Sequence, residues 1–296
     1  MSEIVPRESR FVANGLSHRV LEWDAPDERG APIVCAHGFL DHAWSFHFVA
    51  QHLARAGHRV LAFDWRGHGD TEWIGRGGYY HFEDYLLDLV ELAPHLTKGA
   101  PHHWLGHSMG GTASAMYAGT RPAGLLTLTL CEGLGPPAIA LEAAPDRIAG
   151  WLSSVARVRA ATPRPMRDLD EAAKRLLTQN ADLDPAHARF LAEKGTRVVE
   201  GGLAWRFDPM HRTSSPRVFR PESFRALLAR IDAPVLVVST ELGFRTADHA
   251  ERVAAIPHAH EVELAGVGHN MHWRGAAALA EAVLAHTRRT ASGSPA

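Results

Sequence analysis

The chain has 296 residues and a nearly balanced charge, with 31 lysines and arginines against 33 aspartates and glutamates and a formal net charge of −2. This balance excludes a global electrostatic field that would attract nucleic acid or an anionic membrane. No stretch approaches the roughly 18 consecutive apolar residues that a membrane-spanning helix needs.

The opening segment and the cysteines predict a cytoplasmic location. The opening MSEIVPRESR is charged and lacks the apolar stretch of a signal peptide. The two cysteines, Cys35 and Cys131, lie within apolar, strand-like runs. We therefore expect buried thiols in a reducing compartment rather than a disulfide.

In chain order, the predicted elements begin with an antiparallel hairpin that turns at Asn14-Gly15 within FVANGLSHRVLEWD. Short apolar runs then alternate with amphipathic segments. The predicted strands are 32–38, 58–64, 102–108, 125–132, 234–240 and 260–266, and the clearest helix candidates are 46–57, 82–96 and 108–122. Continuous rather than alternating hydrophobicity is typical of strands covered on both faces, so the pattern predicts an α/β, doubly wound, mostly parallel sheet.

The alternation stops between residues 134 and 221, where no buried-strand run occurs. Apolar residues recur there at helical spacing: Ile148, Trp151, Leu152, Val155 and Val158. Asp168 with Glu171 matches a capping box, and Asp184-Pro185 matches an N-cap followed by proline. We expect a helical cap or lid over residues 134–221, inserted into a core of residues 1–133 and 222–290 and followed by a flexible tail at 291–296.

The strongest functional signal is GHSMG at residues 106–110, which matches the pattern G-x-S-x-G between an apolar strand and a helix. The turn is so tight that side chains at Gly106 or Gly110 would collide with neighbouring backbone. The strained serine between them, Ser108, lifts its hydroxyl clear of the sheet. A chance glycine-rich turn is the alternative, and the strand–motif–helix context weighs against it.

Three further loops follow predicted strands: His37-Gly38, the glycine-rich turn DWRGHG at 64–69, and Gly268-His269. Taken in this order with GHSMG, they resemble the α/β-hydrolase fold family over nearly the whole chain outside the insertion. The resemblance implies an eight-stranded, mostly parallel sheet with an inserted helical cap.

The resemblance also implies roles for individual residues. Ser108 would be the nucleophile and His269 the general base that activates it. The backbone N–H groups of Phe39 and Met109 would form an oxyanion hole. Arg66 and His68 are implied to be structural, and His272 is a weaker alternative base to His269.

The motifs do not identify the carboxylate that would orient His269. In most members of that family it follows the strand after the cap, but PVLVVSTELGF has Gly243 where that aspartate belongs, with Glu241 as the nearest carboxylate. Glu132 ends the strand after the GHSMG helix, at the carboxyl edge of the sheet where α/β folds bind ligands. Some family members take their acid from this strand. Chain order is compatible with both carboxylates. We favour Glu132 for its place at this edge and keep Glu241 as the alternative. A purely structural role for Glu132, an ion pair with a cap arginine or a hydrogen bond into the following turn, is the other interpretation.

A serine nucleophile favours acyl transfer to water and argues against haloalkane dehalogenases and epoxide hydrolases, which use aspartate at this position. By family analogy we expect hydrolysis of a carboxylic ester. Hydrolysis of a lactone, thioester, amide or carbon–carbon bond and perhydrolysis are alternatives. A catalytically silent receptor or scaffold is the rival from another class, because the usual acid is missing at Gly243.

The expected ligand is a small molecule with an apolar acyl or alcohol part. Trp44 near the oxyanion loop and Trp151 of the cap are predicted to line its pocket. Recognition of an acidic substrate group by Arg206, Arg212 or His211 is a further alternative. No phosphate-binding loop and no His/Cys spacing of a metal site occurs in the sequence, so no cofactor or metal is expected.

Overall fold

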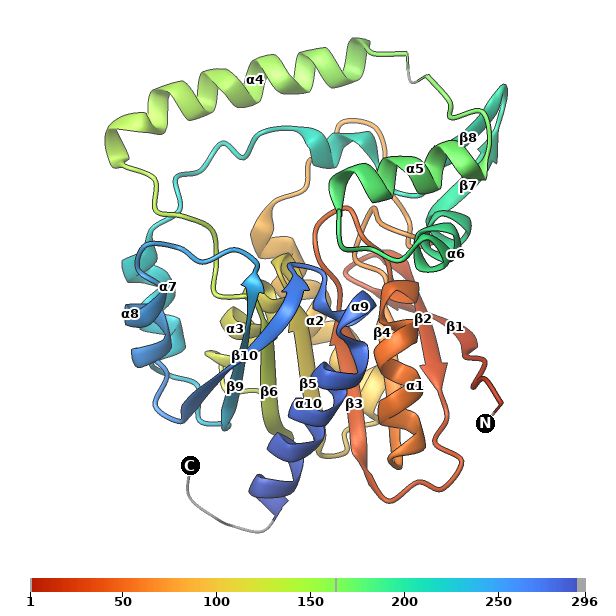
Figure 1. Cartoon of the computed structure of the whole chain (residues 1–296). Coiled ribbons are helices and arrows are strands. Elements are labelled where there is room, and N and C mark those ends of the chain that lie inside the picture. Colours follow the sequence, from red (N-terminus) through yellow and green to blue (C-terminus); the bar gives the residue numbers. More distant parts are fainter. Residues whose placement is uncertain (1, 163, 292–296) are drawn as a thin grey trace.

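The computed structural model describes residues 2–162 and 164–291 and contains the predicted eight-stranded sheet, in the order β1-β2-β4-β3-β5-β6-β9-β10 (Figure 1). The strands are β1 (Arg7–Ala13), β2 (Leu16–Trp23), β3 (Gly30–Ala36), β4 (His58–Phe63), β5 (His102–His107), β6 (Leu125–Cys131), β9 (Val235–Leu242) and β10 (Ala259–Gly268). The strand β2 runs antiparallel to both of its neighbours, and all other neighbouring pairs are parallel.

The edge hairpin turns where the sequence predicts. Asn14 and Gly15 connect β1 to β2 with φ angles of 47° and 74°. Both residues therefore lie in the left-handed region that a two-residue type I′ turn requires, and asparagine and glycine are the residues that reach it at least cost.

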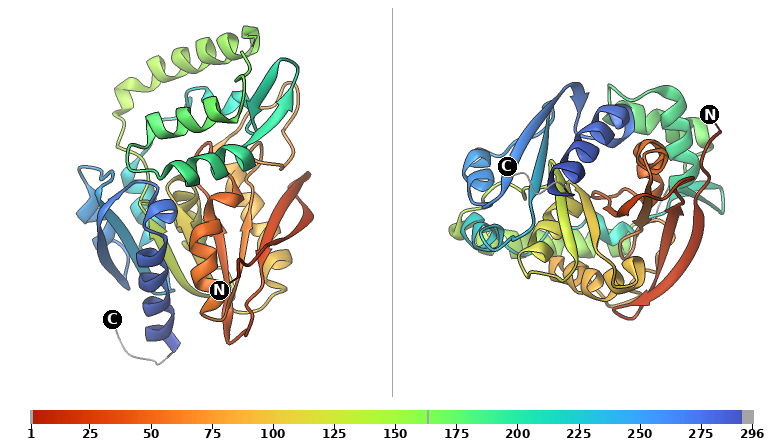
Figure 2. Two further views of the ribbon diagram at one scale, coloured as in Figure 1. Left: turned by 45° about the vertical axis from the view of Figure 1, so that its right-hand side comes forward. Right: turned by 90° about the horizontal axis from the view of Figure 1, so that it is seen from below.

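Helices cover both faces of the sheet, as a doubly wound fold requires (Figure 2). The helices α1 (His47–Arg55), α9 (Met271–Arg274) and α10 (Ala276–Ala291) share one buried apolar cluster, and α2 (Phe82–Thr97), α3 (Met109–Ala118) and α7 (Pro221–Leu228) share the other. Along β3, Val34 belongs to one cluster and Cys35 to the other, because successive strand side chains point to opposite faces. This two-sided burial explains the continuous apolar runs of the sequence.

Both cysteines are buried and free, as predicted. Burial raises the pKa of the Cys35 and Cys131 thiols well above the ordinary value, so neither is a reactive thiolate at neutral pH. Among the described residues, no helix combines the length and the apolar character needed to cross a membrane.

Residues 134–221 lie above the carboxyl ends of the strands (Figure 1). Their elements are η2 (Leu141–Ala143), α4 (Ala144–Ala160), α5 (Leu169–Gln179), α6 (Pro185–Gly195), β7 (Thr196–Val199), β8 (Gly202–Trp205) and η3 (Pro209–Arg212). The side chains of Asp168 and Asp184 cap α5 and α6, as their sequence patterns predict. We propose that this segment, called the cap segment below, forms a lid over the sheet edge.

Two features of the cap segment differ from the expectation of a purely helical insertion. The strands β7 and β8 form an antiparallel hairpin that the sequence did not indicate. The apolar stripe of α4 is also not a core face: Ile148 and Leu152 are 48% and 57% exposed. The helix runs along the outside of the cap segment, away from both clusters that flank the sheet (Figure 1). The tail predicted at 291–296 lies outside the described residues, apart from Ala291 at the end of α10.

The close packing at Gly106 leads to a stability prediction. A Cβ added there would lie 2.6 Å from Gly111 Cα and 2.8 Å from Ser114 Oγ, whereas a Cβ at Gly150 in α4 meets nothing within 4 Å. We expect Gly106→Ala to lower the free energy of unfolding by about 1–3 kcal/mol through overpacking. Gly150→Ala, the matched control, should raise it by about 0.5–1 kcal/mol because alanine loses less backbone entropy in a helix. Urea unfolding measures both, and equal stability of the two variants would contradict this account.

Candidate active site

Ser108 stands at a strained turn between a strand and a helix. The strand β5 ends at His107, α3 begins at Met109, and Ser108 between them has φ 51° and ψ −117°. A Cβ at Gly110 would lie 2.3 Å from the carbonyl oxygen of Ala36, so glycine is required where the turn passes the end of β3. The turn therefore has the geometry that the GHSMG pattern predicts.

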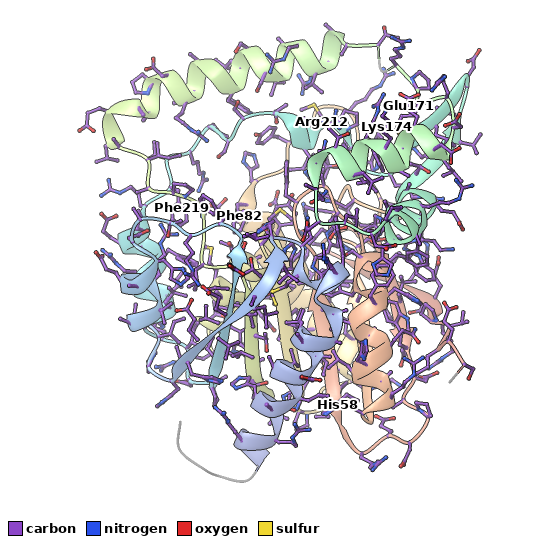
Figure 3. The ribbon with its side chains drawn as sticks, in the orientation of Figure 1. His58, Phe82, Glu171, Lys174, Arg212 and Phe219 are labelled. Carbon is purple, nitrogen blue, oxygen red and sulfur yellow. The ribbon has the colours of Figure 1, made fainter. Side chains whose placement is uncertain are left out.

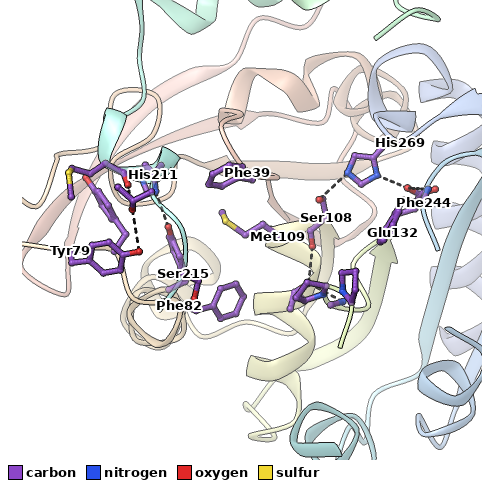
Figure 4. Close-up of a pocket in the computed structure, with 18 residues that line it drawn as sticks. Phe39, Tyr79, Phe82, Ser108, Met109, Glu132, His211, Ser215, Phe244 and His269 are labelled. Carbon is purple, nitrogen blue, oxygen red and sulfur yellow. Dashed lines mark hydrogen bonds and ion pairs between the residues drawn. The ribbon is translucent and has the colours of Figure 1, made fainter. Parts of the chain in front are cut away.

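A continuous hydrogen-bond chain runs from Ser108 through His269 to Glu132 (Figure 4). The distance from Ser108 Oγ to His269 Nε2 is 3.0 Å, and the distance from His269 Nδ1 to Glu132 Oε2 is 2.5 Å. The side chain of His269 is 39% exposed and that of Glu132 is 2% exposed. The chain thus leads from an accessible imidazole to a buried carboxylate.

Glu132 is the first residue after β6, and its carboxylate accepts hydrogen bonds on both oxygens. Oε1 accepts from the backbone N–H of Thr240 at 3.1 Å and from its hydroxyl at 2.5 Å, and Oε2 accepts from the N–H of Phe244 at 3.0 Å. Burial alone would raise the pKa of Glu132, but the hydrogen bonds from His269, Thr240 and Phe244 outweigh it and lower this pKa below the ordinary value. The group is therefore an anion at neutral pH.

Gly243 makes room for this carboxylate. A Cβ at Gly243 would lie only 1.7 Å from Glu132 Oε1. Glu132 thus occupies the space that the side chain of an acid at position 243 would fill. The alternative acid, Glu241, is exposed, and its Oε2 accepts instead from the N–H of Gly266 at 2.9 Å. Of the two candidates, Glu132 is the one that the structure brings to His269.

The two predicted oxyanion N–H groups belong to turns that meet at Ser108. Met109 is the first residue of α3, so its N–H is among those that an α-helix leaves without an internal acceptor. Phe39 follows Gly38, where an added Cβ would lie 3.3 Å from Ser108 Cβ. The ring of Phe39 is 51% exposed and faces the space in front of Ser108 (Figure 4). Whether the two N–H groups act on a substrate oxygen stays a prediction.

The loop that carries His269 is held by the cap segment, which sequence reasoning missed. The N–H of Gly268 donates to Asp182 Oδ2 at 2.9 Å, and the Asn270 amide donates to Asn180 Oδ1 at 2.7 Å. The bonds flank His269 on both sides in sequence. Asp182 and Asn180 lie between two predicted helices and belong to no motif, so no sequence signal identified them.

Two cavities meet at Ser108, His269 and Phe39. One, of about 500 Å³, is lined mainly by aromatic and apolar side chains: Tyr79, Tyr80, Phe82, Tyr85, Met109 and Met210 (Figure 4). The other, of about 660 Å³, has a mixed lining that adds several polar and charged side chains to apolar ones, and its polar residues include Arg175, Gln179, Asn180, Arg206 and Arg212. We call them the apolar cavity and the polar cavity.

The two tryptophans predicted to line the pocket do not line either cavity, and that prediction is wrong. Trp44 packs edge-on against Trp23 and Phe190, with ring centroids 6.2 Å and 5.9 Å away, under the Lys194 ammonium. Trp151 packs edge-on against Tyr79 at 5.3 Å. Tyr79 itself lines the apolar cavity, so Trp151 forms a layer behind it.

Arg66 and His272 each lie beside a carboxylate outside the Ser108–His269–Glu132 chain. Arg66 forms a buried ion pair with Asp88, with Nε 2.7 Å from Oδ2. His272 is fully buried, its Nε2 lies 3.4 Å from Asp41 Oδ2, and burial lowers its pKa. His269 rather than His272 is thus the imidazole that the structure brings to Ser108.

Comparison with known proteins identifies the family. The family model for the α/β hydrolase fold matches residues 31–276, and the chain belongs to this family. A 3-hydroxybutyrate-oligomer hydrolase of Cupriavidus necator is 31% identical over 268 residues, covering 84% of this chain and 85% of that protein. A monoacylglycerol lipase of Mycolicibacterium smegmatis is 30% identical over 221 residues, covering 72% and 69%. A serine hydrolase-like protein of Danio rerio is 26% identical over 182 residues, 60% of this chain, and the match spans only 55% of that protein.

Solved structures agree with this assignment. The crystal structure of a hypothetical protein from Pseudomonas aeruginosa superposes with a TM-score of 0.85 at 28% identity, covering 95% of this chain and 99% of that one. A thioesterase domain from the curacin biosynthetic pathway gives a TM-score of 0.82 at 26% identity, with the same coverage.

The geometry at Glu132 predicts which carboxylate matters for turnover. In Glu132→Gln one accepting carboxylate oxygen becomes an NH₂ donor. The side chain can then donate to His269 Nδ1 instead of accepting its hydrogen, so the imidazole loses its fixed tautomer. We expect kcat to fall by about 10³–10⁴-fold, as when a triad carboxylate becomes an amide. Glu241→Gln, the matched control, should leave kcat nearly unchanged. Steady-state kinetics on an activated ester decides, and a large loss confined to Glu241→Gln would contradict the assignment.

The space at Gly243 gives a second prediction for turnover. In Gly243→Ala the new methyl group would displace the Glu132 carboxylate, because the two would lie 1.7 Å apart. We expect kcat/KM to fall by at least about 100-fold, the scale of a 1 Å displacement in a catalytic group. Gly150→Ala should retain full activity. A Gly243→Ala variant with unchanged kcat/KM would mean that the position of Glu132 is unimportant.

Proposed function

We propose that this protein is a serine hydrolase that cleaves a carboxylic ester through an acyl-enzyme on Ser108. The observation that carries the proposal is the unbroken hydrogen-bond chain from Ser108 through His269 to the buried, ionised Glu132. Serine hydroxyl is a weak nucleophile and needs a base in hydrogen-bond contact. An imidazole fixed by a carboxylate supplies that base.

In the proposed reaction, Ser108 Oγ attacks the ester carbonyl while His269 Nε2 takes the hydroxyl proton. Glu132 keeps the imidazole in the tautomer with hydrogen on Nδ1 and stabilises the imidazolium that forms. The backbone N–H groups of Phe39 and Met109 stabilise the negative charge on the carbonyl oxygen. His269 then protonates the leaving alcohol, and water activated by the same imidazole releases the acid from Ser108.

The two cavities suggest how an ester is oriented across Ser108. We infer that the acyl chain occupies the apolar cavity and that the alcohol part, bearing polar or anionic groups, occupies the polar cavity. Support comes from the relatives, two of which are named as a 3-hydroxybutyrate-oligomer hydrolase and a monoacylglycerol lipase. A thioester is the second candidate linkage, favoured by the similarity to a thioesterase domain.

Arg212 is the cation that favours an anionic alcohol part. Arg175 and Arg206 also line the polar cavity, but each pairs with a carboxylate, that of Glu171 and that of Asp70. Arg212, labelled in Figure 3, lies at the end of η3 in the cap segment. Its guanidinium lies over the Phe207 ring at 4.9 Å, and no ion pair with a carboxylate is found for it among the described residues. An exposed guanidinium beside the cavity is suited to a substrate carboxylate.

The proposal is tested most simply with a fluorophosphonate probe, which reacts with activated serines. We expect stoichiometric labelling of the wild-type protein, mapped to the peptide containing Ser108, and no labelling of Ser108→Ala. The exposed Ser153→Ala should label like the wild type. Absence of labelling in well-folded wild-type protein would favour the rival function, a receptor or scaffold with a silent site.

The orientation of the substrate is tested with a pair of esters that share one acyl chain. One alcohol part carries a carboxylate and the other a neutral group of similar size. We expect Arg212→Gln to raise KM for the carboxylate ester by about 10–100-fold, the cost of losing a charged hydrogen bond, and to leave the neutral ester unaffected. Arg189→Gln on the outer cap surface is the control. Equal effects of Arg212→Gln on both esters would contradict the assigned orientation.

A further inference from the structure

Three metal-ligating side chains meet next to the His269 loop, on elements far apart in the sequence. Asp41 lies in the loop after β3, His107 ends β5, and His272 lies in α9. One ligand atom from each lies within 4.8 Å of the others. Asp41 Oδ2 is 3.4 Å from His272 Nε2, and the two imidazole centroids are 4.3 Å apart.

Hydrogen bonding fixes the protonation of one ligand. His107 Nε2 lies 2.9 Å from the carbonyl oxygen of His269. Because a carbonyl only accepts, Nε2 carries the hydrogen and Nδ1 is a bare lone pair. A hydrogen bond from one ring nitrogen to a carbonyl, which leaves the other free for a metal, is the usual arrangement of a metal-binding histidine.

Asp41 Oδ2 and His272 Nε2 face each other at 3.4 Å and make no other hydrogen bond within the part of the chain that the structure describes. His107 Nδ1 and His272 Nδ1 are buried without any hydrogen-bond partner among the same residues. The two histidines are 2% and 0% exposed. Buried polar atoms without a partner cost free energy, so a cluster of them requires an explanation.

We propose that Asp41, His107 and His272 form a binding site for a divalent transition-metal ion of the zinc class. Two imidazoles and a carboxylate are a common ligand set for such ions. With metal–ligand bonds of about 2.1 Å, neighbouring ligand atoms of a tetrahedral site are about 3.4 Å apart. The ligand atoms of Asp41 and His272 are already 3.4 Å apart. The distances from the His107 ligand atom to the other two lie within 4.8 Å and would shorten toward 3.4 Å when an ion binds. Asp41 and His107 line the polar cavity, which provides the access route.

An ion at this site inhibits hydrolysis. His107 is both a ligand and the partner of the His269 backbone, and the His107 and His269 ring centroids are 4.8 Å apart. A divalent charge beside His269 opposes the positive charge that this imidazole gains when it takes the proton of Ser108. The site therefore lies outside the Ser108–His269–Glu132 chain and acts on it through charge and through the His269 backbone.

Cobalt(II) is the probe, because its visible absorption reports coordination without any need for activity. We expect a single saturable site with the intense absorption of four-coordinate Co²⁺, displaced by Zn²⁺. Asp41→Asn and His272→Gln should weaken binding by at least about 100-fold, since even the loss of an outer-shell partner costs up to that much. His260→Gln is the control, because His260 also lies beside a second histidine, His286, with tilted rings whose centroids are 4.9 Å apart. Circular dichroism verifies that each variant is folded.

Zn²⁺ inhibition of ester hydrolysis is the second measurement. We expect inhibition that EDTA reverses in the wild type and in His260→Gln. The absence of a Co²⁺ spectrum in the wild type, or equal Co²⁺ affinity in all four proteins, would overturn the site. Zn²⁺ that binds there and leaves hydrolysis unchanged would overturn its inhibitory role. The spectrum does not depend on catalysis, so a protein without esterase activity would refute the proposed function and leave the metal site to be judged by its absorption.

Discussion

The buried carboxylate of Glu132 is the contact on which the rest of the site depends. A buried anion without a cation is costly unless hydrogen-bond donors surround it. Thr240, Phe244 and His269 supply those donors, from the end of β9, from the loop after it and from the loop after β10. The carboxylate therefore links the carboxyl ends of three strands. Gly243 is the condition for this arrangement, because any side chain there would take the space of the carboxylate.

The position of His269 depends on the cap segment as well as on the sheet. Glu132 holds the imidazole, His107 holds its backbone carbonyl, and Asp182 and Asn180 hold the residues on either side. The same part of the cap contributes Asn180 to the wall of the polar cavity. The segment that shapes the cavity thus also fixes the loop of the histidine, so movement of the cap would change substrate access and imidazole position together.

Much of this could be predicted from sequence because it follows from local patterns. Apolar runs marked the strands, glycine spacing marked the turn at Ser108, and the absence of an acid at Gly243 directed attention to Glu132. The position of Glu132 beside His269 could be predicted because parallel strands have their carboxyl ends at one edge of the sheet. The prediction that Trp44 and Trp151 line the pocket was wrong because their positions do not follow from local patterns. Their contacts with Phe190 and Tyr79 depend on packing across distant segments, which spacing along the chain does not reveal. The cluster of Asp41, His107 and His272 likewise brings together distant segments, so spacing along the chain does not predict it.

The central claim, that Glu132 fixes the tautomer of His269, is tested most directly by proton NMR of protein labelled with ¹⁵N-histidine. A hydrogen bond of 2.5 Å between His269 Nδ1 and Glu132 Oε2 predicts a far-downfield Nδ1–H resonance, assigned by its loss in His269→Ala. We predict that this resonance persists in Glu241→Gln and disappears from the downfield region in Glu132→Gln. A downfield His269 resonance that survives in Glu132→Gln and vanishes in Glu241→Gln would contradict the account.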